Sequence, residues 1–333
     1  MRRVLLAPAL VAALSGCGGA GHAVPKGFRP ETAAAFGSSD IWVLGQGDTL
    51  IRSTDGGAHF ARVAFPPLPT EGSVPTLEFA SARLGYAYVP RGRLFVTRNG
   101  GRSWSADGHA SSFGLGGGFA YVVSGIEIKR SPVARDAWKT LGVKASLGRD
   151  SIAARGSDVW LLGAPRRGQD STTLAISTDR GRTFATRTGP CFYDLPGQVV
   201  PAGGNVVWAV CPSGMMAGLF VSTNGGRSFG PASFHDPGGT HLPAVTNGAE
   251  IFPLAPRTAI LSGGGDGPLL RTTDAGKSWT VLHPPFRIAG LDGVEFTAPR
   301  FGLALVQTSQ SAASTELWRT TDGGATWRAI PLG

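Results

Sequence analysis

Acidic residues are few in this chain of 333 residues: 22 are Asp or Glu, against 31 Lys or Arg, so the formal net charge is +9. The positive charge is spread along the chain without a basic run. This distribution argues against nucleic-acid binding and favours attraction to anionic lipid headgroups or wall polymers. Glu and Lys, which favour helices, are scarce, whereas 50 residues are Gly, 24 are Pro and 42% are apolar. This composition predicts one large all-β domain with many tight turns.

Several short motifs that mark catalytic or cofactor sites are also missing. The sequence has no calcium loop, no zinc-ligand spacing, no phosphate-binding glycine loop ahead of a helix and no nucleophile elbow. We therefore expect no metal and no cofactor.

The apolar run at the N-terminus, Val4–Leu14, has eleven residues and is too short to cross a bilayer, which needs about 20. Behind two arginines it suits the apolar region of an export signal. The segment Leu14-Ser15-Gly16-Cys17 resembles a bacterial lipobox. The resemblance implies removal of residues 1–16, acylation of Cys17, and anchoring at the outer face of the bacterial cytoplasmic membrane or at a periplasmic membrane face. An ordinary secretory signal with an incidental cysteine is the alternative.

Cysteine is rare, and only Cys17, Cys191 and Cys211 are present. If Cys17 carries lipid, the other two form a pair, and a cysteine pair in an exported protein indicates a disulfide. The loop between them, about 20 residues, predicts a stabilisation of roughly 3 kcal/mol in the chain-entropy model. Two buried free cysteines are the alternative.

An eight-residue pattern recurs along the chain: Ser or Thr, any residue, Asp or Asn, any residue, Gly, any residue, Ser or Thr (His59 in the first copy), and an aromatic. Six copies are clear and a seventh, Ser131–Trp138, keeps only the Ser, the Trp and the length. The copies start 34 to 50 residues apart, a period typical of β-propeller blades. The clear copies are Ser53–Phe60, Thr97–Trp104, Ser177–Phe184, Ser222–Phe229, Thr272–Trp279 and Thr320–Trp327.

These segments resemble the Asp-box, or BNR, repeat, and each residue of the pattern has a structural reason. The third-place carboxylate or amide accepts hydrogen bonds from backbone N–H groups of the turn, the fifth-place Gly permits positive φ, and the closing aromatic packs between sheets. We assign this structural role to Asp55, Asn99, Asp179, Asn224, Asp274 and Asp322.

A short, nearly continuous apolar stretch precedes each turn pattern, as in Asp40–Gly45, Asp158–Gly163 and Gly302–Gln307, and predicts a strand covered on both faces. With one strand before it and two after it, each repeat supplies four antiparallel strands, with the turn pattern between the third and fourth. We predict a seven-bladed β-propeller with simple closure after a lipidated cysteine and flexible tether at 17–30. The predicted domain is 31–333, with blades at about 31–66, 75–108, 110–143, 149–188, 196–232, 246–284 and 291–333.

Beyond the tether, the chain resembles the BNR-repeat propellers, and in repeat number and size the photosystem II assembly-factor-like group. Sortilin-type receptors, sialidases and xyloglucan-degrading glycosidases also contain such repeats, so the fold alone does not choose a function. A sialidase needs a Tyr nucleophile, and three of the four tyrosines, Tyr86, Tyr88 and Tyr121, lie within or beside the apolar strands. Tyr193 is the one loop candidate, next to Asp194.

Ligands of propellers usually bind at the rim opposite the turn patterns, around the mouth of the central channel. Long predicted connections there supply our candidate ligand residues. His235, Asp236 and His241 provide three metal-binding groups within seven residues, but a solvated loop is the interpretation we favour. The full candidate set is Tyr193, Asp194, His235, Asp236, His241 and Asp266.

Cations recur beside the turn patterns. Arg52, Arg130, Arg271 and Arg319 directly precede a pattern, and Arg102, Arg182, Arg227 and Lys277 occupy the sixth place. A solvated rim is one interpretation, and a positive ring that faces the membrane or an acidic partner is the other.

From the sequence we therefore expect a monomeric, lipid-anchored propeller that binds a protein or glycan ligand without catalysis. The alternative is a glycoside hydrolase of the Asp-box type, sialidase-like or other. An acidic cluster with a raised carboxyl pKa at the channel mouth favours the enzyme, whereas a smooth or basic mouth favours the scaffold.

Overall fold

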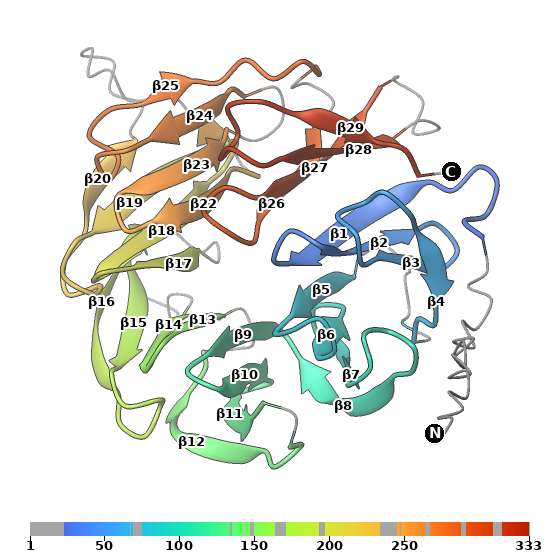
Figure 1. Ribbon diagram of the computed structural model, residues 1–333. Coiled ribbons are helices and arrows are strands. Elements are labelled where there is room, and N and C mark those ends of the chain that lie inside the picture. The colour runs from blue at the N-terminus through green and yellow to red at the C-terminus, as the bar shows by residue number, and fades with distance from the viewer. Residues whose placement is uncertain are drawn as a thin grey trace, which may run out of the picture.

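The computed structural model describes residues 23–66, 68, 75–133, 135–146, 150–163, 171–192, 197–233, 245–246, 248–263, 267–287, 291–308 and 315–332. Within these residues the chain is all β and contains no helix. Seven antiparallel sheets stand around a central axis (Figure 1). The predicted seven-bladed propeller is confirmed.

Each blade is built from one continuous stretch of chain. Blade 1 contains β1 (Pro30–Phe36), β2 (Asp40–Gly45), β3 (Thr49–Ser53) and β4 (Ala61–Val63). Blade 2 contains β5 (Thr76–Phe79), β6 (Gly85–Tyr88), β7 (Gly92–Thr97) and β8 (Ser105–Ala110). Blade 3 contains β9 (Ser112–Gly116), β10 (Phe119–Ser124), β11 (Glu127–Pro132) and β12 (Lys139–Lys144). Blade 4 contains β13 (Ser151–Arg155), β14 (Asp158–Gly163), β15 (Ser171–Ser177) and β16 (Ala185–Phe192).

The remaining three blades follow the same order. Blade 5 contains β17 (Gln198–Gly203), β18 (Val206–Ser213), β19 (Met216–Ser222) and β20 (Gly230–Ser233), and a short extra strand, β21 (Val245–Thr246), pairs with β19. Blade 6 contains β22 (Glu250–Ala255), β23 (Thr258–Ser262), β24 (Leu269–Thr272) and β25 (Thr280–Val281). Blade 7 contains β26 (Leu291–Phe296), β27 (Gly302–Gln307), β28 (Thr315–Thr320) and β29 (Arg328–Ile330).

The second strand of each blade forms the centre of the hydrophobic core. In β2, the side chains from Ile41 to Leu44 are all buried, because neighbouring blades cover both faces of the sheet. The buried apolar residues fall into seven clusters, one at each interface between adjacent blades. The core is therefore divided among seven similar interfaces instead of lying in one central mass.

The ring closes by side-chain packing, as predicted, since the described strands of the first and last blades stay in their own sheets. Ile41 and Ile51 of blade 1 pack with Leu303, Leu317 and Ile330 of blade 7 in one buried cluster. This interface contains the same kinds of contact as the other six.

The first strands of the blades lie closest to the axis of the ring (Figure 1). They are β1, β5, β9, β13, β17, β22 and β26.

The two rims of the ring differ in the connections that they carry. The turn rim holds the connections between third and fourth strands, including every copy of the turn pattern. The N-terminal rim holds the connections between second and third strands and the passages from blade to blade. The chain enters blade 1 at the N-terminal rim. Pro30, the first residue of β1, pairs with Gly45, which lies at the end of β2 opposite to the β1–β2 turn.

Candidate functional site

The six clear turn patterns share one hydrogen-bond network. In the first, the Ser53 hydroxyl accepts the Gly57 N–H at 2.8 Å and donates to Asp55 Oδ1 at 2.7 Å, and Asp55 Oδ1 accepts the His59 N–H at 3.0 Å. The other five turns repeat these contacts at matching positions. The first-place Ser or Thr is buried in all of them. Each turn is thus held by a buried hydroxyl and a third-place Asp or Asn.

These hydrogen bonds also set the charge of the third-place acids. The Ser278 hydroxyl and N–H lower the pKa of Asp274 to about 2. The Thr183 hydroxyl and N–H, and in the first turn the His59 N–H and imidazole, lower the pKa of Asp179 and of Asp55 in the same way. Carboxylates that stay ionised and fully hydrogen-bonded stabilise turns and do not serve as proton donors.

The seventh copy, Ser131–Trp138, uses a different network. Its buried Ser131 hydroxyl accepts the Ala137 N–H at 2.9 Å. Asp136 forms an ion pair with Arg98, and the Trp138 indole donates to Asp107 at 2.9 Å, so both contacts reach back to blade 2. The altered turn is therefore anchored by the preceding blade.

Arginines that precede the turns join neighbouring blades. Arg52 donates to the Gly100 carbonyl of the blade 2 turn at 3.3 Å and to the Asp40 carboxylate of its own blade at 2.6 Å. In the same manner Arg130 donates to the Arg180 carbonyl of blade 4, and Arg319 of the last blade donates to the Gly56 carbonyl of the first.

These contacts change the interpretation of the predicted positive ring. The guanidinium groups of Arg52, Arg130 and Arg319 form hydrogen bonds within the protein and connect adjacent blades. The sixth-place cations, in contrast, are exposed. They are Arg102, Arg182, Arg227 and Lys277.

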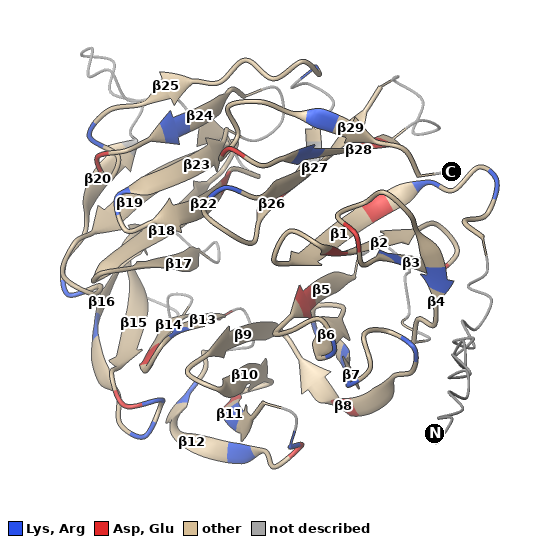
Figure 2. Cartoon of the chain, in the orientation of Figure 1, with Lys and Arg blue, Asp and Glu red and all other residues tan. Residues whose placement is uncertain are grey.

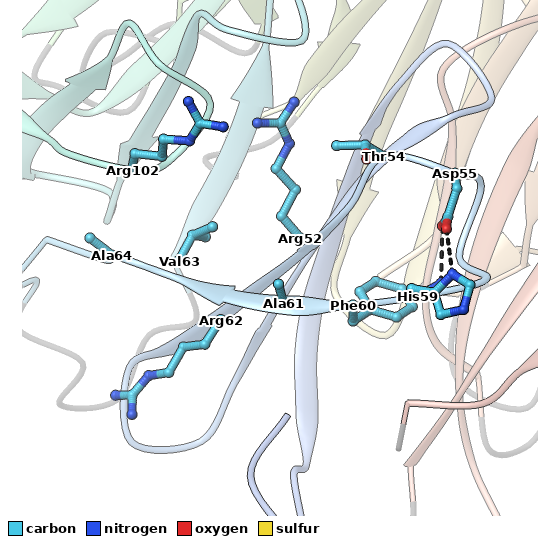
Figure 3. Close-up of a pocket in the computed structure, with 10 residues that line it drawn as sticks. All are labelled: Arg52, Thr54, Asp55, His59, Phe60, Ala61, Arg62, Val63, Ala64 and Arg102. Carbon is cyan, nitrogen blue, oxygen red and sulfur yellow. Dashed lines mark hydrogen bonds and ion pairs between the residues drawn. The ribbon is translucent and has the colours of Figure 1, made fainter. Parts of the chain in front are cut away.

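The turn rim has a hollow of about 720 Å³ between blades 1 and 2 (Figure 3). Arg52 and Arg102 extend to the same side of β4, whereas Arg62, which also borders the hollow, pairs with Ile51 and points away from them (Figure 3). Asp55 lies there hydrogen-bonded to His59 at 2.7 Å. Among the residues that the structure describes, Arg62 and Arg102 form no ion pair. We call this hollow the basic groove.

A smaller counterpart of the basic groove lies between blades 4 and 5, with a volume of about 300 Å³. Its wall includes Arg227 at the sixth place of a turn, as Arg102 is in the basic groove, and Arg187 of β16, whose guanidinium donates to the Arg227 carbonyl at 3.4 Å. Cationic hollows on this rim therefore arise from the repeat itself.

Glutamates on the innermost strands face a different environment. Glu78 of β5 and Glu295 of β26 occupy equivalent positions, opposite Tyr86 and Leu303 at the second place of the adjoining strand. Figure 2 shows the acidic position of β5 close to the axis of the ring. Each carboxyl accepts a backbone N–H from the inner strand of the next blade, that of Leu115 for Glu78 and that of Ala35 for Glu295.

Enclosure by the surrounding inner strands raises the pKa of both groups. Desolvation raises the pKa of Glu78 to about 7, and desolvation with the charges of Glu78 and Glu250 raises the pKa of Glu295 to about 8. The half-buried Glu78 and Glu295 and the exposed Glu250 thus form an electrostatically linked acidic cluster beside the channel. The sequence offered no signal for this cluster, since the three residues lie on strands far apart in the chain.

Cys191 and Cys211 are joined by a disulfide, with an S–S distance of 2.03 Å. The bond connects β16 of blade 4 to β18 of blade 5, so it crosses a blade interface beside the N-terminal rim.

The other residues singled out from the sequence, Cys17, Tyr193, Asp194, His235, Asp236, His241 and Asp266, lie outside the described residues. Within the described part of the chain, no group of three or more His, Cys, Asp or Glu side chains is arranged to hold a metal ion. A search of the same residues finds no helix with the length and apolar character required to span a membrane.

No protein-family model and no curated protein matches the chain. Its fold defines it as a seven-bladed β-propeller, and solved structures share this fold. One is YCF48 bound to a D1 peptide, with 17% identity, a TM-score of 0.57, and coverage of 90% of this chain and 95% of that one. Another is a GH74 enzyme of Niastella koreensis, with 16% identity and a TM-score of 0.52 over 91% of this chain and 43% of the enzyme. A puromycin-hydrolysing peptidase of Mycobacterium tuberculosis has 13% identity and a TM-score of 0.59, over 91% of this chain and 52% of the peptidase.

These similarities establish the fold, and they include a peptide-bound protein as well as enzymes. The chain spans less than half of the GH74 enzyme and about half of the peptidase, but nearly the whole of YCF48.

Proposed function

We propose that this protein is an exported, lipid-anchored scaffold that binds a protein partner without catalysing a reaction. The observation that carries the proposal is the full-length similarity to YCF48, a propeller of nearly the same extent that was solved with a D1 peptide bound. The acylated Cys17 holds the monomeric propeller at the outer face of a bacterial membrane.

The basic groove is the partner site in this proposal. Its exposed cation, Arg102, has no carboxylate partner among the described residues, so it remains available for an acidic segment of another protein. Electrostatic complementarity of this kind increases the association rate and selects against basic partners.

The proposal is tested by capture from the membrane fraction with the full-length protein. The variant Arg102→Glu is expected to lose the partner that the wild type retains. Arg300→Glu is the matched control, because Arg300 is also exposed and lies on the turn rim, in the connection between β26 and β27. Equal capture by Arg102→Glu and the control contradicts the assignment of the groove. Retention of Cys17→Ser in washed membranes contradicts the lipid anchor.

One observation favours the alternative function, a glycoside hydrolase. Glu78 and Glu295 have raised pKa values near the channel, as a general acid requires. Both carboxyls, however, accept N–H groups from neighbouring blades and so have a structural role as well. Release of reducing sugar from a panel of glycans, abolished in Glu78→Gln and Glu295→Gln, supports the enzyme. No release by the wild type contradicts it.

A further inference from the structure

Three of the five large apolar side chains that the described residues leave exposed lie on the N-terminal rim. Ile126 is 53% exposed at the β10–β11 turn, Phe192 is 53% exposed at the end of β16, and Met215 is 87% exposed at the β18–β19 turn. They come from blades 3, 4 and 5, which are neighbours in the ring. Exposed apolar side chains that gather on one face indicate an interaction surface.

The β18–β19 hairpin extends further than its counterpart in blade 1. In blade 1 the pairing of second and third strands ends at Gly45 and Thr49. Blade 5 continues for two further pairs past the Cys211–Gly218 pair, to Ser213 and Met216. At 3.4 Å per residue this extension adds about 7 Å to the hairpin. Met215 lies at its tip.

The extended hairpin is held firmly from two sides. The Cys191–Cys211 disulfide ties its base to β16, directly beside Phe192. The extra strand β21 pairs with Met216 and Ala217 near its tip. These braces keep apolar side chains in solvent, which is unfavourable unless a partner covers them.

The chain enters the propeller at this same rim. The Gln46 N–H donates to the Arg29 carbonyl at 2.9 Å, and Phe28 lies against Gly45 at the end of β2. Cys17 lies six positions before Ala23, the first described residue, and a span of six residues reaches at most about 20 Å. A lipid on Cys17 therefore lies within about 20 Å of the segment that enters the N-terminal rim.

Exposed cations accompany the apolar side chains. Lys26 and Arg29 lie in the segment that leads into blade 1, Arg91 lies in the β6–β7 turn, and Lys144 pairs in register with Glu127 beside the β10–β11 turn. Cations next to exposed apolar residues suit an anionic membrane surface.

We infer that the N-terminal rim lies flat on the membrane, with Met215, Phe192 and Ile126 inserted into the headgroup region. The inference rests on the lipid anchor of the proposed function. It orients the propeller so that the basic groove, on the turn rim, faces away from the bilayer.

The orientation is tested with single bimane labels on the full-length acylated protein bound to vesicles of phosphatidylglycerol and phosphatidylethanolamine with brominated acyl chains. Met215→Cys and Ile126→Cys place the label on the N-terminal rim. Thr223→Cys is the matched control, since Thr223 is exposed and directly follows Ser222, the last residue of β19, at the end of that strand opposite to Met215. The Cys191–Cys211 disulfide leaves the introduced thiol free for selective labelling.

Loss of bimane fluorescence at positions 215 and 126 but not at 223 is the expected result, because inserted apolar residues lie about 5–10 Å into the interface. Quenching at 223 alone overturns the orientation, and so does a vesicle-bound protein with no quenching at any position, which leaves the rim free for a protein partner. Failure of the wild type to remain with the vesicles overturns the anchor itself, and the orientation with it.

Discussion

Replacement of Glu295 by Gln is expected to make the protein more stable at high pH and to leave its stability at low pH nearly unchanged. The folded protein raises the pKa of Glu295 from 4.5 to about 8, so the folded state binds a proton that the unfolded chain releases. The unfavourable contribution is absent below pH 4.5, grows as the pH rises through this window, and is complete above pH 8. Gln keeps an oxygen that accepts the Ala35 N–H but carries no charge.

The size of the effect follows from the pKa difference. At 1.36 kcal/mol per unit, a fully desolvated carboxyl with this shift destabilises the fold by roughly 5 kcal/mol. Glu295 is only half-buried, and water in the channel screens the charge, so we expect about 1–2 kcal/mol. For a protein of this size, 1 kcal/mol corresponds to a change of about 2–4 °C in Tm.

Urea denaturation at pH 5 and pH 9, with the disulfide intact, measures this effect. Glu295→Gln is expected to match the wild type at pH 5 and to exceed its unfolding free energy at pH 9. Glu127→Gln is the control, because Glu127 is exposed and its carboxylate lies 2.7 Å from Lys129. If the difference between Glu295→Gln and the wild type is the same at both pH values, Glu295 does not titrate as described.

Three further predictions concern the framework. Ser222→Ala removes a buried hydroxyl that accepts the Gly226 N–H at 2.8 Å, and is expected to lower the unfolding free energy by about 1–3 kcal/mol, whereas the exposed Thr223→Ala changes it by about 0.5 kcal/mol or less. Gly57→Ala places a Cβ 2.9 Å from Ile330 at φ 93° and is expected to lower Tm more than Gly47→Ala, which has positive φ but open space. Reduction of the disulfide is expected to lower the unfolding free energy by about 2–4 kcal/mol, measured by urea denaturation with and without reductant.

Repetition made much of the fold predictable. The apolar stretches Asp40–Gly45, Asp158–Gly163 and Gly302–Gln307 coincide with β2, β14 and β27. A strand that is buried on both faces is apolar along nearly its whole length, so the sequence alone reveals it. The turn network was equally local. Each of its hydrogen bonds lies within one stretch of eight residues, so sequence spacing alone identifies the partners.

Features that depend on two blades at once were not visible in the sequence. Arg52 and Arg319 directly precede a turn pattern, but their hydrogen bonds to the neighbouring blade depend on where that blade lies. The pairing of β21 with β19 and the linked charges of Glu78 and Glu295 likewise arise from segments distant in the chain. The turn pattern requires no particular residue type at its fourth place, yet Arg180 and Ala275 adopt positive φ there.

The closure of the ring by packing alone has a consequence for how the polypeptide can be rearranged. Every sheet is made from one continuous stretch of chain. The break between the last and first blades is therefore topologically equivalent to a break between any other two adjacent blades. A circular permutant that begins at blade 3 and rejoins residue 333 to residue 23 through a short linker retains all seven interfaces. The ring therefore has no obligatory first blade.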